Sequence, residues 1–257
     1  MRKKAKIIDL SVPLENFASE PWPPTITYWD HEEGARNLGM SENVGADEFP
    51  DGIGLAWEKV EAITHAGTHL DAPWHFGPLS EGKKAKTIDE VPLEWCYGDG
   101  VVLDVTYKKP GELITLDDIK RALEKINYQI KEGDIVLIRT DAYKRWGKNA
   151  YLTEHPGMSA EATLWLIEQG VKIIGIDAYG FDRPFKHMFN DYRKTRDNKN
   201  LWPAHFVGRV KEYCHIEKLA NLDKIPKPYG FKVACFPIKI RKASAGWARV
   251  VAIIEET

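Results

Sequence analysis

Residues 65–76 read HAGTHLDAPWHF and hold three of the eight histidines in this chain of 257 residues. His65 and His69 lie four positions apart, and Asp71 follows two residues later. Pro73 prevents a helix from running through the stretch. The pattern predicts a compact turn beside a strand, with two imidazoles and one carboxylate around one point. Two nitrogens and one oxygen in this arrangement suit a divalent transition metal.

The third histidine of the stretch, His75, follows Ala-Pro-Trp and should point away from the tight cluster. A neutral imidazole can accept a proton near neutral pH. We therefore favour a general base over a metal ligand for His75, and a packed side chain is the remaining interpretation.

Partners for this cluster must come from further along the chain. Four histidines are candidates: His155, His187, His205 and His215. His205 lies in LWPAHF, and Glu217 follows twelve residues later. Spacing alone is weak evidence for this pair. His215 is the local rival, and its ordinary interpretation is a surface residue or a residue that supports a ligand.

The centre of the chain has an α/β pattern. Short apolar or alternating runs predict strands at residues 6–12, 56–64, 101–105, 134–140 and 171–177, of which the second should be half-buried and the last three buried. Thr115 and Ser159 are suited to cap two helices between these strands, and Gly170 should end the second. At the end of the chain, FKVACFPIKI and ARVVAIIEE flank a turn-like KASAG, which predicts a closing antiparallel pair.

We expect a single domain spanning residues 1–257. Two stretches of it are predicted to be loops that project from its surface. Residues 30–52 are rich in acidic side chains, and residues 183–200 are rich in basic ones. We expect solvated surface excursions, with a lid or a subunit contact as the alternative.

Composition sets the class of protein. Apolar residues make up 43 % of the chain and charged residues 29 %, as in ordinary globular proteins, and the formal net charge is −2. Neither nucleic acid nor a membrane is therefore expected as a partner. The three cysteines are far apart without a CxxC motif, and the early apolar run is broken at Asp9. We expect a cytoplasmic protein.

The histidine-rich stretch resembles the H-x-G-T-H-x-D-x-P-x-H-F signature of the cyclase family of metal-dependent hydrolases. This family includes bacterial kynurenine formamidases and isatin hydrolases. The resemblance continues through PAHFVGRVKEYCHIEKLANL at residues 203–222 and FPIKIRKASAGWARVVAI at residues 236–253. It implies an α/β fold of the swivelling β/β/α cyclase type with a mixed sheet, assembled as a homodimer or homotetramer.

The resemblance also implies roles for individual residues. His65, His69 and Asp71 would bind a first metal. Asp71, His205 and Glu217 would bind a second where the family has two, and His75 would be the catalytic histidine. The donor set accepts zinc or manganese.

This chemistry predicts hydrolysis of a small amide, formamide or lactam by a metal-activated water, with His75 as general base. A lactone or ester hydrolase of the same family is one alternative, and a non-catalytic metal-binding protein is another. A non-haem iron oxygenase would leave His65, His75 and Glu217 unexplained. No G-x-S-x-G motif offers a serine nucleophile.

Overall fold

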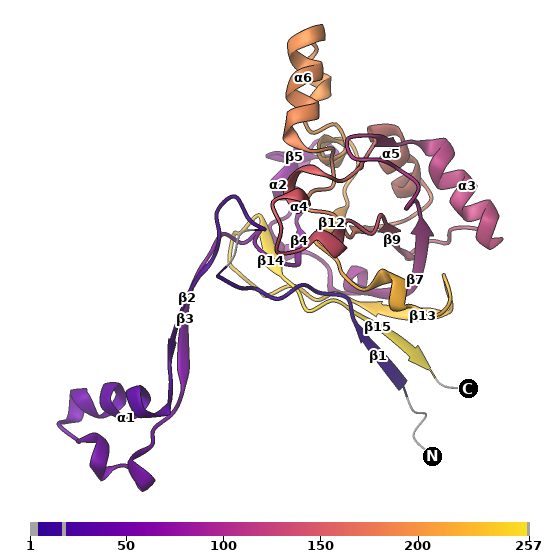
Figure 1. The fold of residues 1–257 in the computed structure, drawn as a ribbon. Coiled ribbons are helices and arrows are strands. Elements are labelled where there is room, and N and C mark those ends of the chain that lie inside the picture. Colours follow the sequence, from indigo (N-terminus) through magenta and orange to yellow (C-terminus); the bar gives the residue numbers. More distant parts are fainter. Residues whose placement is uncertain (1–4, 17–18, 256–257) are drawn as a thin grey trace.

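A computed structural model describes residues 5–16 and 19–255, and one curled mixed sheet forms its centre (Figure 1). Nine strands lie in the order β1-β15-β13-β7-β9-β11-β12-β4-β14. They are β1 (Ala5–Asp9), β4 (His69–Asp71), β7 (Tyr97–Asp104), β9 (Ile135–Arg139), β11 (Ile173–Ile176), β12 (Cys214–Glu217), β13 (Phe231–Ala234), β14 (Ala245–Trp247) and β15 (Val251–Glu255). Strands β7, β9, β11 and β12 pair in parallel, and the remaining pairs are antiparallel.

The buried apolar strands explain this centre. β9 and β11 consist largely of isoleucine, leucine and valine, and nearly all of their residues are buried. One hydrophobic cluster covers one face of the sheet and includes α3 (Leu116–Ile126) and α5 (Ala160–Glu168), and a second cluster fills the other face. Both helices begin as predicted, because Thr115 and Ser159 accept hydrogen bonds from backbone amides in the first turns.

The smaller elements lie around this sheet. The remaining strands form pairs: β2 (Thr25–Trp29) with β3 (Trp57–Glu61), β5 (Leu79–Ser80) with β6 (Lys83–Lys84), and β8 (Leu113–Ile114) with β10 (Gly157–Met158). The other α-helices are α1 (His31–Gly39), α2 (Pro73–Phe76), α4 (Ala150–Thr153) and α6 (Phe185–Thr195). Short 3-10 turns span Met40–Glu42, Ala46–Glu48, Pro50–Gly52, Ile88–Glu90, Leu93–Cys96, Ala142–Arg145, Asn198–Asn200, His205–Arg209 and Leu222–Lys224. None of the helices within residues 5–16 and 19–255 is long and apolar enough to cross a membrane.

The prediction of loops for the two charged stretches is wrong. Residues 30–52 contain α1, because the Asp30 side chain accepts a hydrogen bond from the Glu33 amide and Glu33 caps in return. Residues 183–200 contain α6, which begins after Pro184. Figure 1 shows that both project from the body.

The predicted strand at residues 56–64 is real but not half-buried. β3 covers Trp57–Glu61, all five of its residues are exposed, and it pairs with β2 outside the central sheet. The predicted closing pair is present, since Lys232 in β13 lies opposite Ile253 in β15. The KASAG segment is more than a turn, because Ala245 and Gly246 belong to β14.

Candidate metal centre

Two neighbouring strands carry the polar residues of the site. β4 and β12 run antiparallel, with His215 opposite Asp71 and Glu217 opposite His69. Side chains two apart on a strand share a face, and directly opposite residues share it too. All four side chains therefore stand on one face of the sheet. The cluster is buried, with His69, Asp71 and His215 fully inaccessible.

Asp71 lies at the centre of this cluster. Its Oδ1 atom is 2.8 Å from His65 Nδ1 and 3.3 Å from His69 Nε2. Its Oδ2 atom is 2.9 Å from His215 Nε2 and 3.9 Å from His75 Nε2. His65 precedes β4, and His75 comes from α2. One carboxylate is thus surrounded by four imidazoles.

Glu217 provides the second carboxylate of the cluster. Its Oε1 atom is 3.5 Å from the Nε2 atoms of both His205 and His215, and its Oε2 atom is 3.7 Å from His69 Nε2. One potential ligand atom from each of Asp71, His205, His215 and Glu217 lies within 4.8 Å of the others. His65, Asp71 and His75 form a second group that meets the same limit. The structure therefore brings together all six residues singled out in the sequence.

The polar atoms at the centre of the cluster are suited to bind a cation. Both carboxylate oxygens of Asp71 and the Nε2 atoms of His69 and His215 are buried, and within the described part of the chain their close contacts do not have the geometry of a hydrogen bond. Buried polar atoms are almost always satisfied in folded proteins. Nitrogen and carboxylate oxygen atoms that converge in this way are suitable ligands for zinc or manganese.

The contacts of the histidine Nδ1 atoms also support a metal site. In three rings Nδ1 is engaged by a group outside the cluster: the Gly67 carbonyl oxygen for His69 at 2.9 Å, Asp182 Oδ2 for His205 at 2.6 Å and the Tyr213 hydroxyl for His215 at 3.1 Å. Metal-binding histidines are usually oriented by such a contact on the other ring nitrogen. The Nε2 atoms are consequently directed toward Asp71 and Glu217.

Charge is concentrated in this buried volume. Burial opposes ionisation of Asp71, but His65, His75 and His69 hold the pKa of its carboxyl well below the usual range. The pKa of Glu217 is also lowered despite burial, mainly by His215. Although burial opposes its charged form, contacts with the two carboxylates raise the pKa of His215 to about 9. Two ionised carboxylates in one buried site require a nearby positive charge.

His75 has the opposite electrostatic character. Burial, together with His205, His65 and His215, lowers the pKa of His75 to about 4, although Asp71 opposes this shift. Its side chain is 33 % exposed, so it is open to the pocket beside the cluster. A histidine in this state is neutral at pH 7 and can accept a proton.

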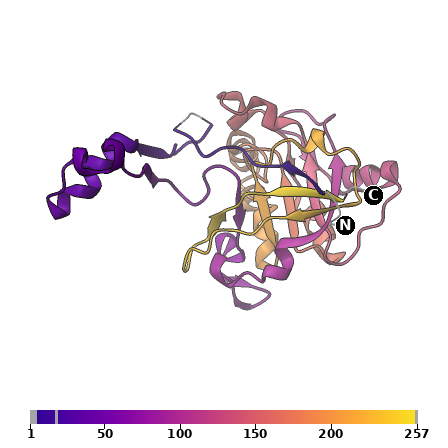
Figure 2. The ribbon, with the colours of Figure 1, turned by 90° about the horizontal axis from the view of Figure 1, so that it is seen from below.

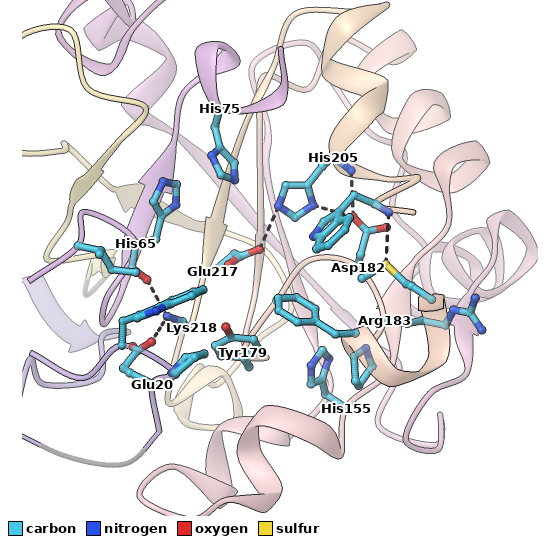
Figure 3. Close-up of a pocket in the computed structure, with 18 of the residues that line it drawn as sticks. Glu20, His65, His75, His155, Tyr179, Asp182, Arg183, His205, Glu217 and Lys218 are labelled. Atoms are coloured by element: carbon cyan, nitrogen blue, oxygen red, sulfur yellow. Dashed lines mark hydrogen bonds and ion pairs between the residues drawn. The ribbon is translucent and has the colours of Figure 1, made fainter. Parts of the chain in front are cut away.

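A pocket of about 350 Å³ opens beside the cluster (Figure 3). His65, His75, His205 and Glu217 line it near the sheet. Its remaining wall is largely apolar and includes Ile63, Trp22, Tyr179, Phe185, Met188, Trp202 and Phe206. Such a pocket accommodates a small molecule with a ring, oriented by a few polar groups.

The remaining histidines have different positions. His155 is buried and lines the pocket, but it is outside both ligand groups. His187 lies on α6, also outside the groups. His215 was expected only as a local rival to the pair of His205 and Glu217, with a surface or supporting residue as its ordinary interpretation. The signal was available in the H-x-E alternation of residues 215–217, which places His215 and Glu217 on one face of a strand.

Comparisons with known proteins identify similar chains. The family model described as "Putative cyclase" matches residues 8–183. A kynurenine formamidase from Bacillus cereus (strain ATCC 10987 / NRS 248) is 30 % identical over 255 residues, covering 97 % of this chain and 98 % of the relative. An isatin hydrolase from Roseibium aggregatum is 28 % identical over 222 residues, covering 79 % of this chain and 77 % of the relative.

A solved structure supports the fold. The crystal structure of an isatin hydrolase bound to the product analogue thioisatinate superimposes with a TM-score of 0.75 at 23 % identity. The match covers 98 % of this chain and 93 % of that one. The predicted mixed α/β fold of the cyclase type is therefore confirmed.

Proposed function

This chain belongs to the cyclase family, and on that premise we propose that it is a metal-dependent hydrolase of C–N bonds in a small amide, formamide or lactam. One observation carries the proposal: the Asp71 carboxylate is fully buried among four histidines and Glu217, and within the described part of the chain none of its contacts has the geometry of a hydrogen bond. A buried anion of this kind needs a cation, and it lies beside a pocket for a small molecule.

The chain offers ligands for one or two ions. His65, His69 and Asp71 would hold the first, and Asp71, His205 and Glu217 would hold a second. His215 belongs to the same ligand group as Asp71, His205 and Glu217. When bound, a divalent metal supplies an acidified water and polarises a carbonyl group. Zinc and manganese both suit these ligands.

The chain's own residues complete the reaction. His75 is neutral at pH 7 and faces the pocket, so its free ring nitrogen accepts the proton of the attacking water. The same nitrogen then returns the proton to the leaving nitrogen of the substrate. The aromatic wall of Trp22, Tyr179 and Trp202 holds a ring and excludes water from the reacting carbonyl.

The names of the relatives support this choice of substrate class. The two relatives described above are a kynurenine formamidase and an isatin hydrolase. We therefore favour an aryl formamide or a cyclic amide as the substrate over a lactone or an aryl ester.

The test is metal depletion followed by addition of Mn²⁺ or Zn²⁺, with an aryl formamide, isatin and an aryl ester as substrates. We expect turnover of at least one amide to disappear on depletion and to return with one of the metals. Glu217→Gln should lower the amount of metal bound per chain, whereas the exposed variant Glu124→Gln should not. Full activity of the metal-free protein would overturn the proposal.

A further inference from the structure

One tyrosine of the pocket wall carries a hydroxyl group with no role in the proposed reaction. Tyr179 lies in the loop of residues 177–184, which connects β11 to α6. This loop leaves the central sheet well away from the projecting residues 30–52 (Figures 1 and 2). The Tyr179 side chain is half-buried and lines the pocket. Its hydroxyl is therefore close enough to a bound substrate to contribute to the reaction.

The Tyr179 hydroxyl is free to donate a hydrogen bond. Within residues 5–16 and 19–255 it has no hydrogen-bond partner, and unlike the hydroxyl of Tyr151 it is not enclosed by protein atoms. Burial, together with Glu217 and Glu20, raises the pKa of Tyr179 above its usual range. The phenol is therefore protonated at neutral pH and can donate to a bound molecule.

The charged groups beside Tyr179 are already engaged with each other. Lys218 Nζ donates to Glu20 Oε2 and to the His65 carbonyl, each at 2.6 Å. The same ammonium group lies 5.0 Å from the centre of the Tyr179 ring, which is a cation–π contact. Lys218 and Glu20 thus hold the ring in place and leave its hydroxyl available.

The backbone fixes the loop of Tyr179 against the metal cluster. On one side of Tyr179, the Ala178 carbonyl accepts from the Lys218 amide at 3.0 Å. On the other side, the Phe181 amide donates to Glu217 Oε1 at 2.8 Å. Because the loop is anchored on both sides, the phenol is held close to Glu217. A donor that is in place before the substrate binds needs no reorganisation during the reaction.

His75 and Tyr179 approach the cluster from different sides. In Figure 3, Glu217 lies between them, and both residues line the pocket. A carbonyl group placed over the cluster therefore has the general base on one side and a hydroxyl donor on the other. Since the base takes the proton of the attacking water, the carbonyl oxygen is the group that the hydroxyl can serve.

We propose that the Tyr179 hydroxyl donates a hydrogen bond to the carbonyl oxygen of the substrate and stabilises the negative charge that forms there. This inference rests on the proposed function. Attack of water on the carbonyl carbon moves one electron pair of the C=O bond to the oxygen, and collapse of this tetrahedral anion expels the amide nitrogen. The nitrogen takes the proton that His75 accepted from the water. Tyr179 keeps its own proton throughout and acts as an oxyanion donor.

The test compares Tyr179→Phe with Tyr151→Phe in the full, metal-loaded chain. Tyr179→Phe removes only the hydroxyl and keeps the ring against Lys218 and Phe185. Tyr151 is the matched control, because its ring lies 6.3 Å from that of Tyr179 but the residue does not line the pocket. The constants kcat and KM are measured with an aryl formamide and with isatin, and bound metal is counted on the same preparations.

We expect Tyr179→Phe to keep its metal and to lower kcat by about 10²- to 10³-fold, the typical cost of removing one oxyanion donor. The Michaelis constant KM should change little, because the hydrogen bond strengthens only as the oxygen gains charge. Tyr151→Phe should keep its activity. An unchanged kcat, a loss confined to KM or a parallel loss of metal would overturn the proposal, and so would an equal loss in Tyr151→Phe.

A second measurement does not depend on turnover. Phenylphosphonate carries a tetrahedral anion, whereas benzamide carries an uncharged carbonyl group. Binding of both is followed by quenching of tryptophan fluorescence, since Trp22 and Trp202 line the pocket. Tyr179→Phe should weaken phenylphosphonate binding by about tenfold more than benzamide binding, because hydrogen bonds to charged groups are the stronger ones.

The binding result separates this inference from the proposed function. Equal affinities of Tyr179→Phe and the unchanged chain for phenylphosphonate would overturn the role of the hydroxyl. A chain that binds phenylphosphonate through Tyr179 but hydrolyses no amide would contradict the proposed function, while Tyr179 would stand as a donor to a tetrahedral anion.

Discussion

His215 Nε2 lies 2.9 Å from Asp71 Oδ2, and the register of β12 against β4 places the two residues directly opposite each other. The pair joins the conspicuous histidine-rich stretch to a segment about 140 residues later. This contact makes His215 part of the candidate metal centre rather than a residue that only neighbours Glu217.

The first prediction concerns this residue. His215→Gln keeps a polar side chain of similar size but loses the imidazole between the two carboxylates. We expect metal affinity to fall by about 10- to 100-fold, as for other residues that bind or orient a metal. The affinity is measured by competition with a chelator. His187→Ala on α6 is the control, and equal affinities for both variants would contradict the assignment.

The second prediction concerns the loop before β4 and the start of the strand. His65→Ala and His69→Ala should each abolish metal retention and activity, since both rings contact Asp71 Oδ1. Metal is counted by elemental analysis after gel filtration. A metal-replete, fully active His65→Ala protein would remove His65 from the ligand set.

The third prediction separates His75 from the ligands. His75→Ala should retain its metal but lose turnover by about 10²- to 10⁴-fold, the typical contribution of a general base. Metal content and kcat are measured on the same preparation. If both fell in proportion, His75 would be a ligand, which its place in the group with His65 and Asp71 also permits.

The fourth prediction concerns a buried ion pair in the wall of the pocket (Figure 3). Lys218 Nζ lies 2.6 Å from Glu20 Oε2 and donates to the His65 carbonyl at 2.6 Å, while Glu20 accepts from the Gly67 amide at 2.7 Å. Lys218→Met should lower the free energy of unfolding by about 3–5 kcal/mol, because Glu20 would remain buried and unpaired.

Urea unfolding measures this loss, and the double variant Glu20→Gln/Lys218→Met should cost less than the two single losses added together. The exposed pair of Lys232 and Asp99, at 2.8 Å, provides the control. Lys232→Met should change stability by no more than about 1 kcal/mol. Similar losses for Lys218 and Lys232 would show that the buried pair does not hold the metal-site loop.

The fifth prediction concerns pH and the start of α3. Burial opposes ionisation of Asp118, but hydrogen bonds from Thr115, Tyr107 and Lys108 lower its pKa. A carboxyl with a lowered folded pKa stabilises the fold above its unfolded pKa, and this stabilisation is lost as pH falls through the folded value. Asp118→Asn should therefore cost about 1 kcal/mol at pH 7.

The difference between the two proteins should shrink below about pH 4, where the carboxyl of the unfolded chain becomes protonated. Thermal unfolding between pH 2 and pH 7 measures it. Asp117→Asn changes the same charge at an exposed neighbour and should have little effect. A difference that stays constant with pH would contradict the role of the ionised carboxylate.

Local patterns in the sequence determined much of the fold. Runs of β-branched residues marked β9 and β11, and the caps Thr115 and Ser159 marked two helices, because these signals act within one strand or one turn. The spacing of His65, His69 and Asp71 marked the site for the same reason. The strand β3 was wrongly predicted to be half-buried, because burial depends on what packs against the strand and alternation alone does not report that.

The tertiary structure decided which distant residues meet. Strand pairing set Asp71 opposite His215 and His69 opposite Glu217, and a shift of one residue in that register would turn the side chains to the other face. No local signal fixes this register, because it follows from the packing of both faces of the sheet. The sequence thus determined which residues could bind a metal, and only the folded sheet determined that His215 stands among them.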